Sequence, residues 1–281
     1  MSRRDRYEAW VDSTAYRRER AEKARVIHHL CAAELEAAGR IVDLGAGTGI
    51  IKNELEEITG KYIVGIEMDT SFIERPGGMV VGDATRLPLE GGSVDFVVMN
   101  HLYEHVRDQG GLFHEVERVL APGGTAYVAA GNRLAVMEPH YRLPFLSWLP
   151  RPLADAYLRV TGRGDSYRGI RFLTRRGLER RIRAAGLRTE DRTRRALDEL
   201  TADTWGPGWA RAWRAISALP DLAVDPLLRQ LSPQWFLLVH KPRDPVPADR
   251  PGRGGLLRSR RRSSGRSRGR GRSGRKGRGR R

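Results

Sequence analysis

Three glycines on alternate positions, placed directly after a short apolar segment, constrain the fold of this chain more than any other feature. Residues 41–42 are apolar and lead through Asp43 to Gly45, Gly47 and Gly49, after which a helix-forming pattern begins. This order predicts a buried strand, a tight turn and the start of a helix. Glycine permits positive φ and lets a ligand approach the backbone. Backbone N–H groups at a helix start favour a small anionic or polar ligand.

Two further apolar segments each end in an acidic residue. Residues 62–66 are followed by Glu67, with Asp69 two positions later, and residues 79–81 lead to Asp83. A carboxylate at the end of a second strand can accept hydrogen bonds from both hydroxyls of a ribose. Glu67 is therefore the candidate for that contact, and Asp69 is the alternative.

The next part of the chain continues the alternation of strand and helix. Residues 94–99 form a fourth apolar segment that ends at Asn100, and residues 112–121 have the pattern of an amphipathic helix stopped by Pro-Gly-Gly. Residues 125–130 predict a fifth strand. Strands that alternate with helices are typical of a doubly wound, mostly parallel sheet.

These motifs, in this order over residues 40–131, resemble the type-11 group of class I S-adenosylmethionine-dependent methyltransferases. The G-x-G-x-G pattern differs from the G-x-G-x-x-G of nicotinamide and flavin folds. The resemblance implies a Rossmann-like α/β fold whose seven strands lie in the order 3-2-1-4-5-7-6, with helices on both faces and S-adenosylmethionine as the cofactor. It implies that the cofactor-binding residues are Asp43, Gly45, Ala46, Gly47, Gly49, Glu67, Asp83, Ala84 and Asn100. In the family, an acid at the position of Asp83 binds the adenine amine, and the N–H at the position of Ala84 reaches a ring nitrogen.

The regions that flank these motifs define the expected domain organisation. Residues 1–39 predict an N-terminal helical segment, residues 40–241 the methyltransferase domain, and residues 242–281 a disordered tail rich in Arg, Gly and Ser. Within the domain, residues 131–173 are expected to form a lid, because four prolines divide an apolar and aromatic stretch. Residues 197–231 are expected to be a helical insertion. Its indoles are Trp205, Trp209 and Trp213, which share one helix face and should pack on the body of the fold.

The methyl donor is already activated, so the protein must chiefly hold the acceptor in line with the S–CH₃ bond, which contributes about 7–11 kcal/mol. A hydroxyl acceptor would also need a general base. His140 in the lid is the first candidate, and His105 and His101 after the fourth strand come next. The alternative for each of these histidines is a structural role, in which the imidazole packs in the lid or lies on a helix surface. The chain has one cysteine, Cys31, which excludes a disulfide framework and a cysteine-based metal cluster, and we expect no metal.

The formal net charge of +17 is concentrated at the C-terminus. Residues 250–281 contain 14 arginines, one lysine and no acid, so they carry +15 of this charge and leave +2 for the rest of the chain. Such a tail can bind nucleic-acid phosphates or an anionic membrane surface, or can have no dedicated partner. No apolar run approaches a membrane span and no secretory leader is apparent. We therefore expect a cytoplasmic protein, with peripheral contact to a membrane left open.

The expected reaction is direct methyl transfer to a hydroxyl of a sugar, a lipid-linked glycan or a small natural product. One alternative is a nucleic-acid methyltransferase that uses the basic tail. The sequence Asn100-His101-Leu102-Tyr103 lacks the Asn/Asp-Pro-Pro-aromatic arrangement that resembles enzymes methylating base amines. The other alternative is a catalytically silent module that retains the cofactor pocket and engages RNA through the tail.

Overall fold

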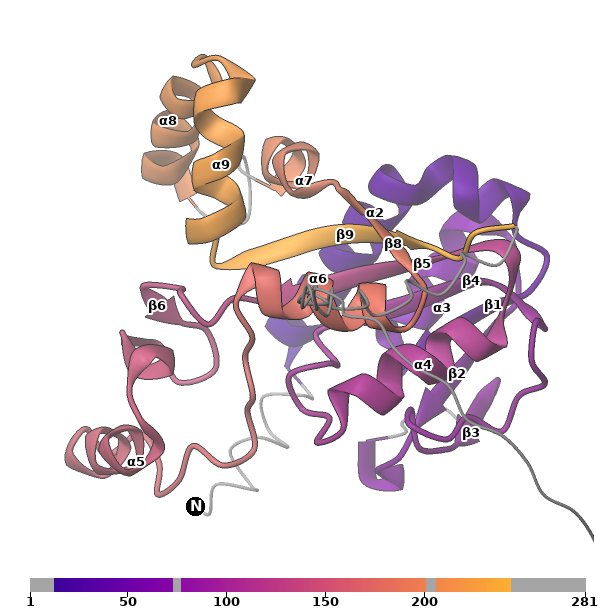
Figure 1. Cartoon of the computed structure of the whole chain (residues 1–281), viewed down its shortest axis with the longest axis horizontal. Helices are drawn as coiled ribbons and strands as arrows, with labels where there is room; N and C mark the ends of the chain where they lie inside the picture. The colour runs from indigo at the N-terminus through magenta and orange to yellow at the C-terminus, as the bar shows by residue number, and fades with distance from the viewer. Residues whose placement is uncertain (1–12, 73–76, 201–205, 244–281) are drawn as a thin grey trace, which may run out of the picture. The chain divides into compact units, whose positions relative to one another are not determined.

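A seven-stranded sheet forms the centre of the protein (Figure 1). The structure is a computed structural model that describes residues 13–72, 77–200 and 206–243. The strands are β1 (Ile41–Leu44), β2 (Ile63–Glu67), β3 (Met79–Val81), β4 (Val94–Asn100), β5 (Leu120–Gly131), β8 (Arg188–Asp191) and β9 (Gln234–His240). Their order is β3-β2-β1-β4-β5-β9-β8, and β9 runs antiparallel to both of its neighbours. The predicted order 3-2-1-4-5-7-6 is confirmed, since the labels β6 and β7 belong to a separate small hairpin.

Helices cover both faces of this sheet. The helices along the chain are α2 (Thr14–Ala37), α3 (Ile50–Thr59), α4 (Gln109–Val119), α5 (Arg151–Val160), α6 (Arg175–Ala184), α7 (Thr193–Leu200), α8 (Gly206–Ser217) and α9 (Asp221–Leu231). Side chains of α4 and α6 pack with Val97 and Met99 of β4 in one apolar cluster. Side chains of α2, α3 and α7 pack with Phe96 and Val98 in another. The two clusters follow from the alternation of side chains along a strand.

The ends of the helices follow signals in the sequence. The hydroxyl of Thr174 accepts a hydrogen bond from the N–H of Gly177 and caps α6, and Gly186 follows that helix with a φ of 82°. Asp108 caps α4 in the same way, so this helix begins three residues before the predicted start. Cys31 is buried in the core, and burial raises the pKa of its thiol to about 12.

The segment predicted as a lid is built of short pieces. It contains the hairpin of β6 (Met137–Glu138) and β7 (Leu143–Pro144), a 3₁₀ turn (Leu146–Trp148) and α5. The side chains of Leu146 and Leu158 are fully buried and belong to the same apolar cluster as Val97 and Met99 of β4, so this segment is packed into the main core. A long connection anchored in this way can shape a pocket more rigidly than an exposed loop.

The helical insertion begins earlier than predicted, because α7 starts at Thr193 rather than at residue 197. β8 accordingly ends at Asp191, two residues before α7 begins. The indole of Trp213 is buried and donates to Asp198 at 2.8 Å, as expected for a residue that packs on the fold. The side chains of Trp205 and Trp209, and the tail from residue 244 onward, lie outside the described residues. Among the described residues, no helix has the length and apolar character needed to cross a membrane.

Candidate active site

The glycine loop lies between the end of β1 and the start of α3. Gly45, Gly47 and Gly49 have φ values of 70°, 55° and 75°. A Cβ atom on Gly45 would lie 2.7 Å from Cδ1 of Leu102, whereas a Cβ on Gly47 would meet no atom within 4 Å. The N–H groups of Gly45 and Ala46 donate to the carbonyl of Ile66 at 2.8 and 3.2 Å, which fixes the loop against β2. The positive φ at position 45 favours glycine, and the space over Gly47 is open to a ligand.

Glu67 faces this loop from the end of β2. One of its carboxylate oxygens accepts from the N–H of Gly47 at 2.8 Å, and the other accepts from the N–H groups of Met68 and Asp69 at 2.8 and 3.0 Å. Asp69 is exposed and accepts hydrogen bonds from Ser71. The geometry thus favours Glu67 over Asp69 for the contact with ribose.

Two buried polar groups lie at the same edge of the sheet. Asp43 is 2% exposed, and within the described part of the chain its Oδ2 atom has no hydrogen-bond partner, nor does the side-chain nitrogen of Asn100. Burial and the nearby charge of Glu67 raise the pKa of Asp43 to about 7. An unsatisfied buried polar group costs about 1–3 kcal/mol. A cationic ligand with polar groups would satisfy Asp43 and Asn100 together.

The third acid is brought beside the second by strand pairing. Glu67 lies opposite Val81 where β2 pairs with β3, and the N–H of Gly82 donates to the carbonyl of Glu67 at 3.1 Å. Asp83 follows, with an exposed carboxylate whose Oδ1 accepts from the N–H and hydroxyl of Thr85 at 2.8 Å, and Ala84 is partly buried next to it. The loop, Glu67 and Asp83 therefore lie at one edge of the sheet. The carboxylates of Glu67 and Asp83 and the uncovered backbone at Gly47 suit the adenosine part of S-adenosylmethionine, and the buried Asp43 suits its sulfonium.

His140 lies in the lid and is held by a buried carboxylate. Its Nδ1 atom is 2.9 Å from Oε1 of Glu138, which is fully buried and also accepts from the N–H of Tyr141 at 2.7 Å. The hydroxyl of Tyr167 lies 3.4 Å from the same Oε1. With Nδ1 assigned as the donor to Glu138, the Nε2 atom of His140 is the ring's proton acceptor.

The loop after β4 supplies the other two histidines. His101 has a φ of 56°, and its Nδ1 lies 3.0 Å from Oε1 of Glu104, a fully buried residue. Burial raises the pKa of Glu104, but the hydrogen bond and charge of His101 outweigh burial and hold it below its usual value. Desolvation lowers the pKa of His105, which favours the neutral imidazole that a general base requires.

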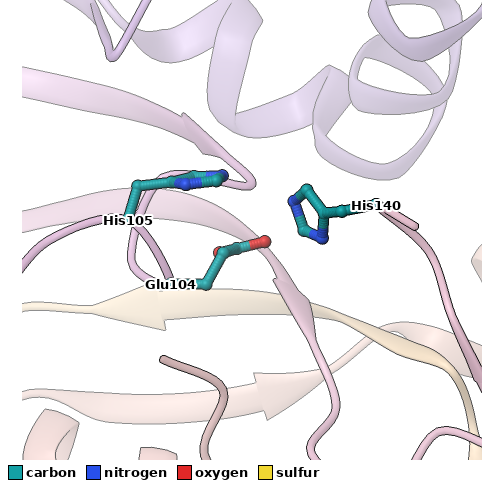
Figure 2. Close-up of side chains that lie close together, drawn as sticks. All are labelled: Glu104, His105 and His140. Carbon is teal, nitrogen blue, oxygen red and sulfur yellow. The ribbon is translucent and has the colours of Figure 1, made fainter. Parts of the chain in front are cut away.

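The structure brings His105 and His140 together from separate segments (Figure 2). Their ring centroids are 5.2 Å apart in an edge-on arrangement, and the carboxyl group of Glu104 points toward the space between them. One donor atom from each of these three residues lies within 4.8 Å of the others. Two imidazoles and a carboxylate can also hold a divalent transition metal, although bonds of about 2 Å need the donors closer together.

The sequence favours His140 because Glu138 and Tyr141 lie beside it, but it gives no comparable reason to name Glu104 as a partner of a histidine. In the sequence, Glu104 directly precedes His105, and Glu138 lies two positions before His140. An acid this close to a histidine is common in any sequence. Neither pattern distinguishes a buried acid from a solvated one. Only the packing of the lid against the loop after β4 reveals that the two carboxylates are buried.

The sheet order, the glycine loop after the first strand and the acids at the next two strand ends define a class I methyltransferase fold. Residues 42–128 match the family model described as a methyltransferase domain, type 11. The chain therefore contains a methyltransferase domain of this family, whose cofactor is S-adenosylmethionine.

Several curated proteins are similar to this chain. A demethylmenaquinone methyltransferase of Mycobacterium sp. (strain KMS) is 31% identical over 159 residues, which cover 52% of this chain and 66% of that protein. A ubiquinone biosynthesis O-methyltransferase of Chelativorans sp. is 29% identical and covers 59% of this chain and 65% of its own length. The chain thus spans just under two thirds of the length of these relatives.

Solved structures share the fold. An S-adenosylmethionine-dependent methyltransferase from Mesorhizobium loti has a TM-score of 0.50 and 18% identity, with 76% of this chain and 97% of that chain covered. At this level of identity the likeness concerns the fold alone.

Proposed function

We propose that this protein transfers a methyl group from S-adenosylmethionine to a hydroxyl of a small-molecule acceptor. The observation that carries the proposal is the pairing of His140 with the buried Glu138, in a lid that follows β5 at the carboxyl edge of the parallel strands. The glycine loop, Glu67 and Asp83 lie at this edge too. Cofactor binding by Asp43, Gly49, Ala84 and Asn100 belongs to the same proposal.

The residues of this chain have separate tasks in the proposed reaction. The bound cofactor supplies a methyl group activated by its sulfonium. Glu138 keeps His140 in one orientation and one tautomer, so that Nε2 accepts the proton of the acceptor hydroxyl as the new O–CH₃ bond forms. His105 packs against His140 and serves as the second candidate base. The lid positions the acceptor for in-line transfer.

The class of acceptor is the least constrained part of the proposal. Sugars, lipid-linked glycans and small natural products all carry suitable hydroxyls. The names of the relatives include O-methylation in ubiquinone biosynthesis and on malonyl-[acyl-carrier protein]. These two names support an oxygen acceptor and differ in the molecule that bears it, whereas the name demethylmenaquinone methyltransferase of other relatives states no acceptor atom. The domain limits at residues 40–241 and a contact of the tail with a membrane surface or nucleic acid remain part of the prediction.

Incubation of cell extracts with isotope-labelled S-adenosylmethionine and the purified protein tests the activity. Mass spectrometry should find a labelled small molecule whose labelling is unchanged when residues 250–281 are removed. Labelled RNA or DNA that disappears with the tail would support the nucleic-acid alternative. Cofactor binding without any labelled product would support the silent module.

Asp83→Ala should weaken the binding of S-adenosylhomocysteine about tenfold, since it removes one hydrogen bond to adenine worth about 1.4 kcal/mol. Calorimetric titration measures this change. Asp69→Ala is the matched control, because Asp69 is also an exposed loop acid that accepts hydrogen bonds from a nearby hydroxyl residue. Equal affinities of the two variants would show that the adenine contact has been misplaced.

Prolonged treatment with a strong chelator should leave the methylation rate unchanged if His140 acts as a base. The same three donors, Glu104, His105 and His140, could otherwise hold a metal ion. A rate that falls with chelation and returns when zinc, iron or magnesium is added would instead make these residues ligands. The assay is the labelled-product measurement, with the untreated protein as reference.

A further inference from the structure

A pocket of about 330 Å³ next to the histidines is lined by five arginines and by no acidic residue. The five come from the loop after β4, the segment after β5, the first residue of α5, the segment before α6, and α6 itself: Arg107, Arg133, Arg151, Arg171 and Arg181. The remaining lining includes Gln109, Ser147 and several apolar side chains. We propose that this pocket binds the phosphate or diphosphate group of the methyl acceptor.

Among the described residues, the five pocket arginines have no carboxylate partner, and what distinguishes them from other unpaired arginines is that they line one pocket. Elsewhere in the fold, Arg175 contacts Glu179 at 2.7 Å and Arg192 contacts Glu34 at 2.7 Å. Within the described ranges, none of the five pocket arginines forms an ion pair, and the one side-chain hydrogen bond among them joins Arg181 to the carbonyl of Gly177 at 3.5 Å. Arginine cannot lose its proton, so gathered guanidinium groups repel one another until an anion neutralises them.

The backbone under the pocket is fixed by hydrogen bonds. The N–H of Arg133 donates to the carbonyl of Leu173 at 3.0 Å, and the hydroxyl of Ser147 donates to the carbonyl of Arg133 at 2.9 Å. The side chain of Gln109, itself buried, donates to the carbonyl of Arg171 at 2.7 Å. Three segments are thereby held around one space before any ligand arrives, which reduces the entropy cost of binding.

The number of cations and the size of the pocket indicate the chemistry of the ligand. One carboxylate is satisfied by a single guanidinium fork, whereas a diphosphate offers enough oxygens and charge for several. Ligand pockets for small molecules begin at about 300 Å³, so this one suits a compact group better than a nucleic-acid strand. The apolar side chains Leu149, Ile170 and Phe172 would contact the part of the acceptor next to the phosphate.

The pocket adjoins the proposed catalytic pair. Phe172 and Tyr167 line the pocket and also contact the catalytic pair. The ring centroid of Phe172 lies 5.6 Å from that of His140, and the hydroxyl of Tyr167 lies 3.4 Å from Oε1 of Glu138. An acceptor anchored by its phosphate could therefore present a hydroxyl to His140. The presentation of a hydroxyl to His140 rests on the proposed function, whereas the binding of an anion in the pocket does not.

Calorimetric titration of the full chain with inorganic pyrophosphate tests the inference. The double variant Arg133→Gln/Arg171→Gln should lower the affinity for pyrophosphate at least tenfold. The affinity of Arg133→Lys/Arg171→Lys should be intermediate between that of the glutamine variant and that of the unmodified protein. The control is Arg159→Gln/Arg180→Gln, which removes the same charge from exposed positions outside the pocket. The basic tail is present in every variant and contributes equally.

Equal affinities of the pocket and control variants would overturn the assignment. Displacement of pyrophosphate by farnesyl diphosphate would support a lipid-linked acceptor, and displacement by UDP-glucose would support a soluble one. Failure of both to displace it would overturn the proposal that an organic diphosphate is the ligand. A protein that binds pyrophosphate in this pocket but methylates nothing would refute the proposed function and leave the anion site standing.

Discussion

His140→Asn should lower the turnover number by about a hundred- to a thousandfold, the range over which a positioned general base accelerates proton transfer. Asparagine keeps a hydrogen-bonding side chain near the buried Glu138 but cannot accept the proton of a hydroxyl. Because the glycine loop and Glu67 are untouched, the affinity for S-adenosylhomocysteine should stay within about twofold. Steady-state kinetics with the identified acceptor and calorimetric titration measure the two quantities.

The matched control is His114→Asn, since His114 is an exposed histidine on α4. It should retain full turnover. His105→Asn should have a smaller effect than His140→Asn, because no carboxylate among the described residues forms a hydrogen bond with His105 like the one that orients His140. If His140→Asn retained full activity while His105→Asn lost it, the roles of the two histidines would have to be exchanged.

Asp43→Asn should stabilise the ligand-free protein and weaken cofactor binding at the same time. The pKa of Asp43 is raised to about 7 by burial and by Glu67, against the opposing charges of Lys52 and Arg20. An acid with a raised pKa in the folded state lowers stability progressively as pH rises from about 4 to 7, because the folded protein must hold a proton that the unfolded chain releases. At pH 8 the variant should therefore be more stable by about 2–4 kcal/mol.

Chemical denaturation at pH 4.5 and pH 8 measures this difference, which should be small at the lower pH. S-adenosylmethionine carries a sulfonium cation, so losing the carboxylate should weaken its binding about ten- to a hundredfold. Asp165→Asn serves as the control, since Asp165 is exposed. An Asp43→Asn variant that is less stable at pH 8 and binds the cofactor normally would show that Asp43 is a structural residue.

The sheet could be predicted from sequence because its signals are local and ordered. The Gly45–Gly49 loop and the acids Glu67 and Asp83 mark the ends of the first three strands, whereas α4 already ends at Val119 and the predicted Pro-Gly-Gly stop lies within β5. Boundaries were less predictable where polar residues dominate. Asp108 could not be identified as a helix cap before the structure showed its hydrogen bond to Gly111, and the charged stretch around Asp191 did not reveal where β8 ends.

The two halves of the candidate site differ in how far the sequence reveals them. The cofactor side could be predicted because strand pairing forces its residues to one edge of the sheet. The acceptor side depends on how the lid packs on the loop after β4. Arg107 and Arg181 lie 74 positions apart in the sequence, and nothing in the local pattern around either places them in one pocket.

A crystal structure of the protein with S-adenosylhomocysteine tests the central claim most directly. Adenosine should lie across the loop at Gly45–Gly49, with its ribose hydroxyls at the Glu67 carboxylate and its adenine amine at Asp83. Density for the ligand at any other place, or saturating ligand that leaves this edge of the sheet empty, would contradict the account.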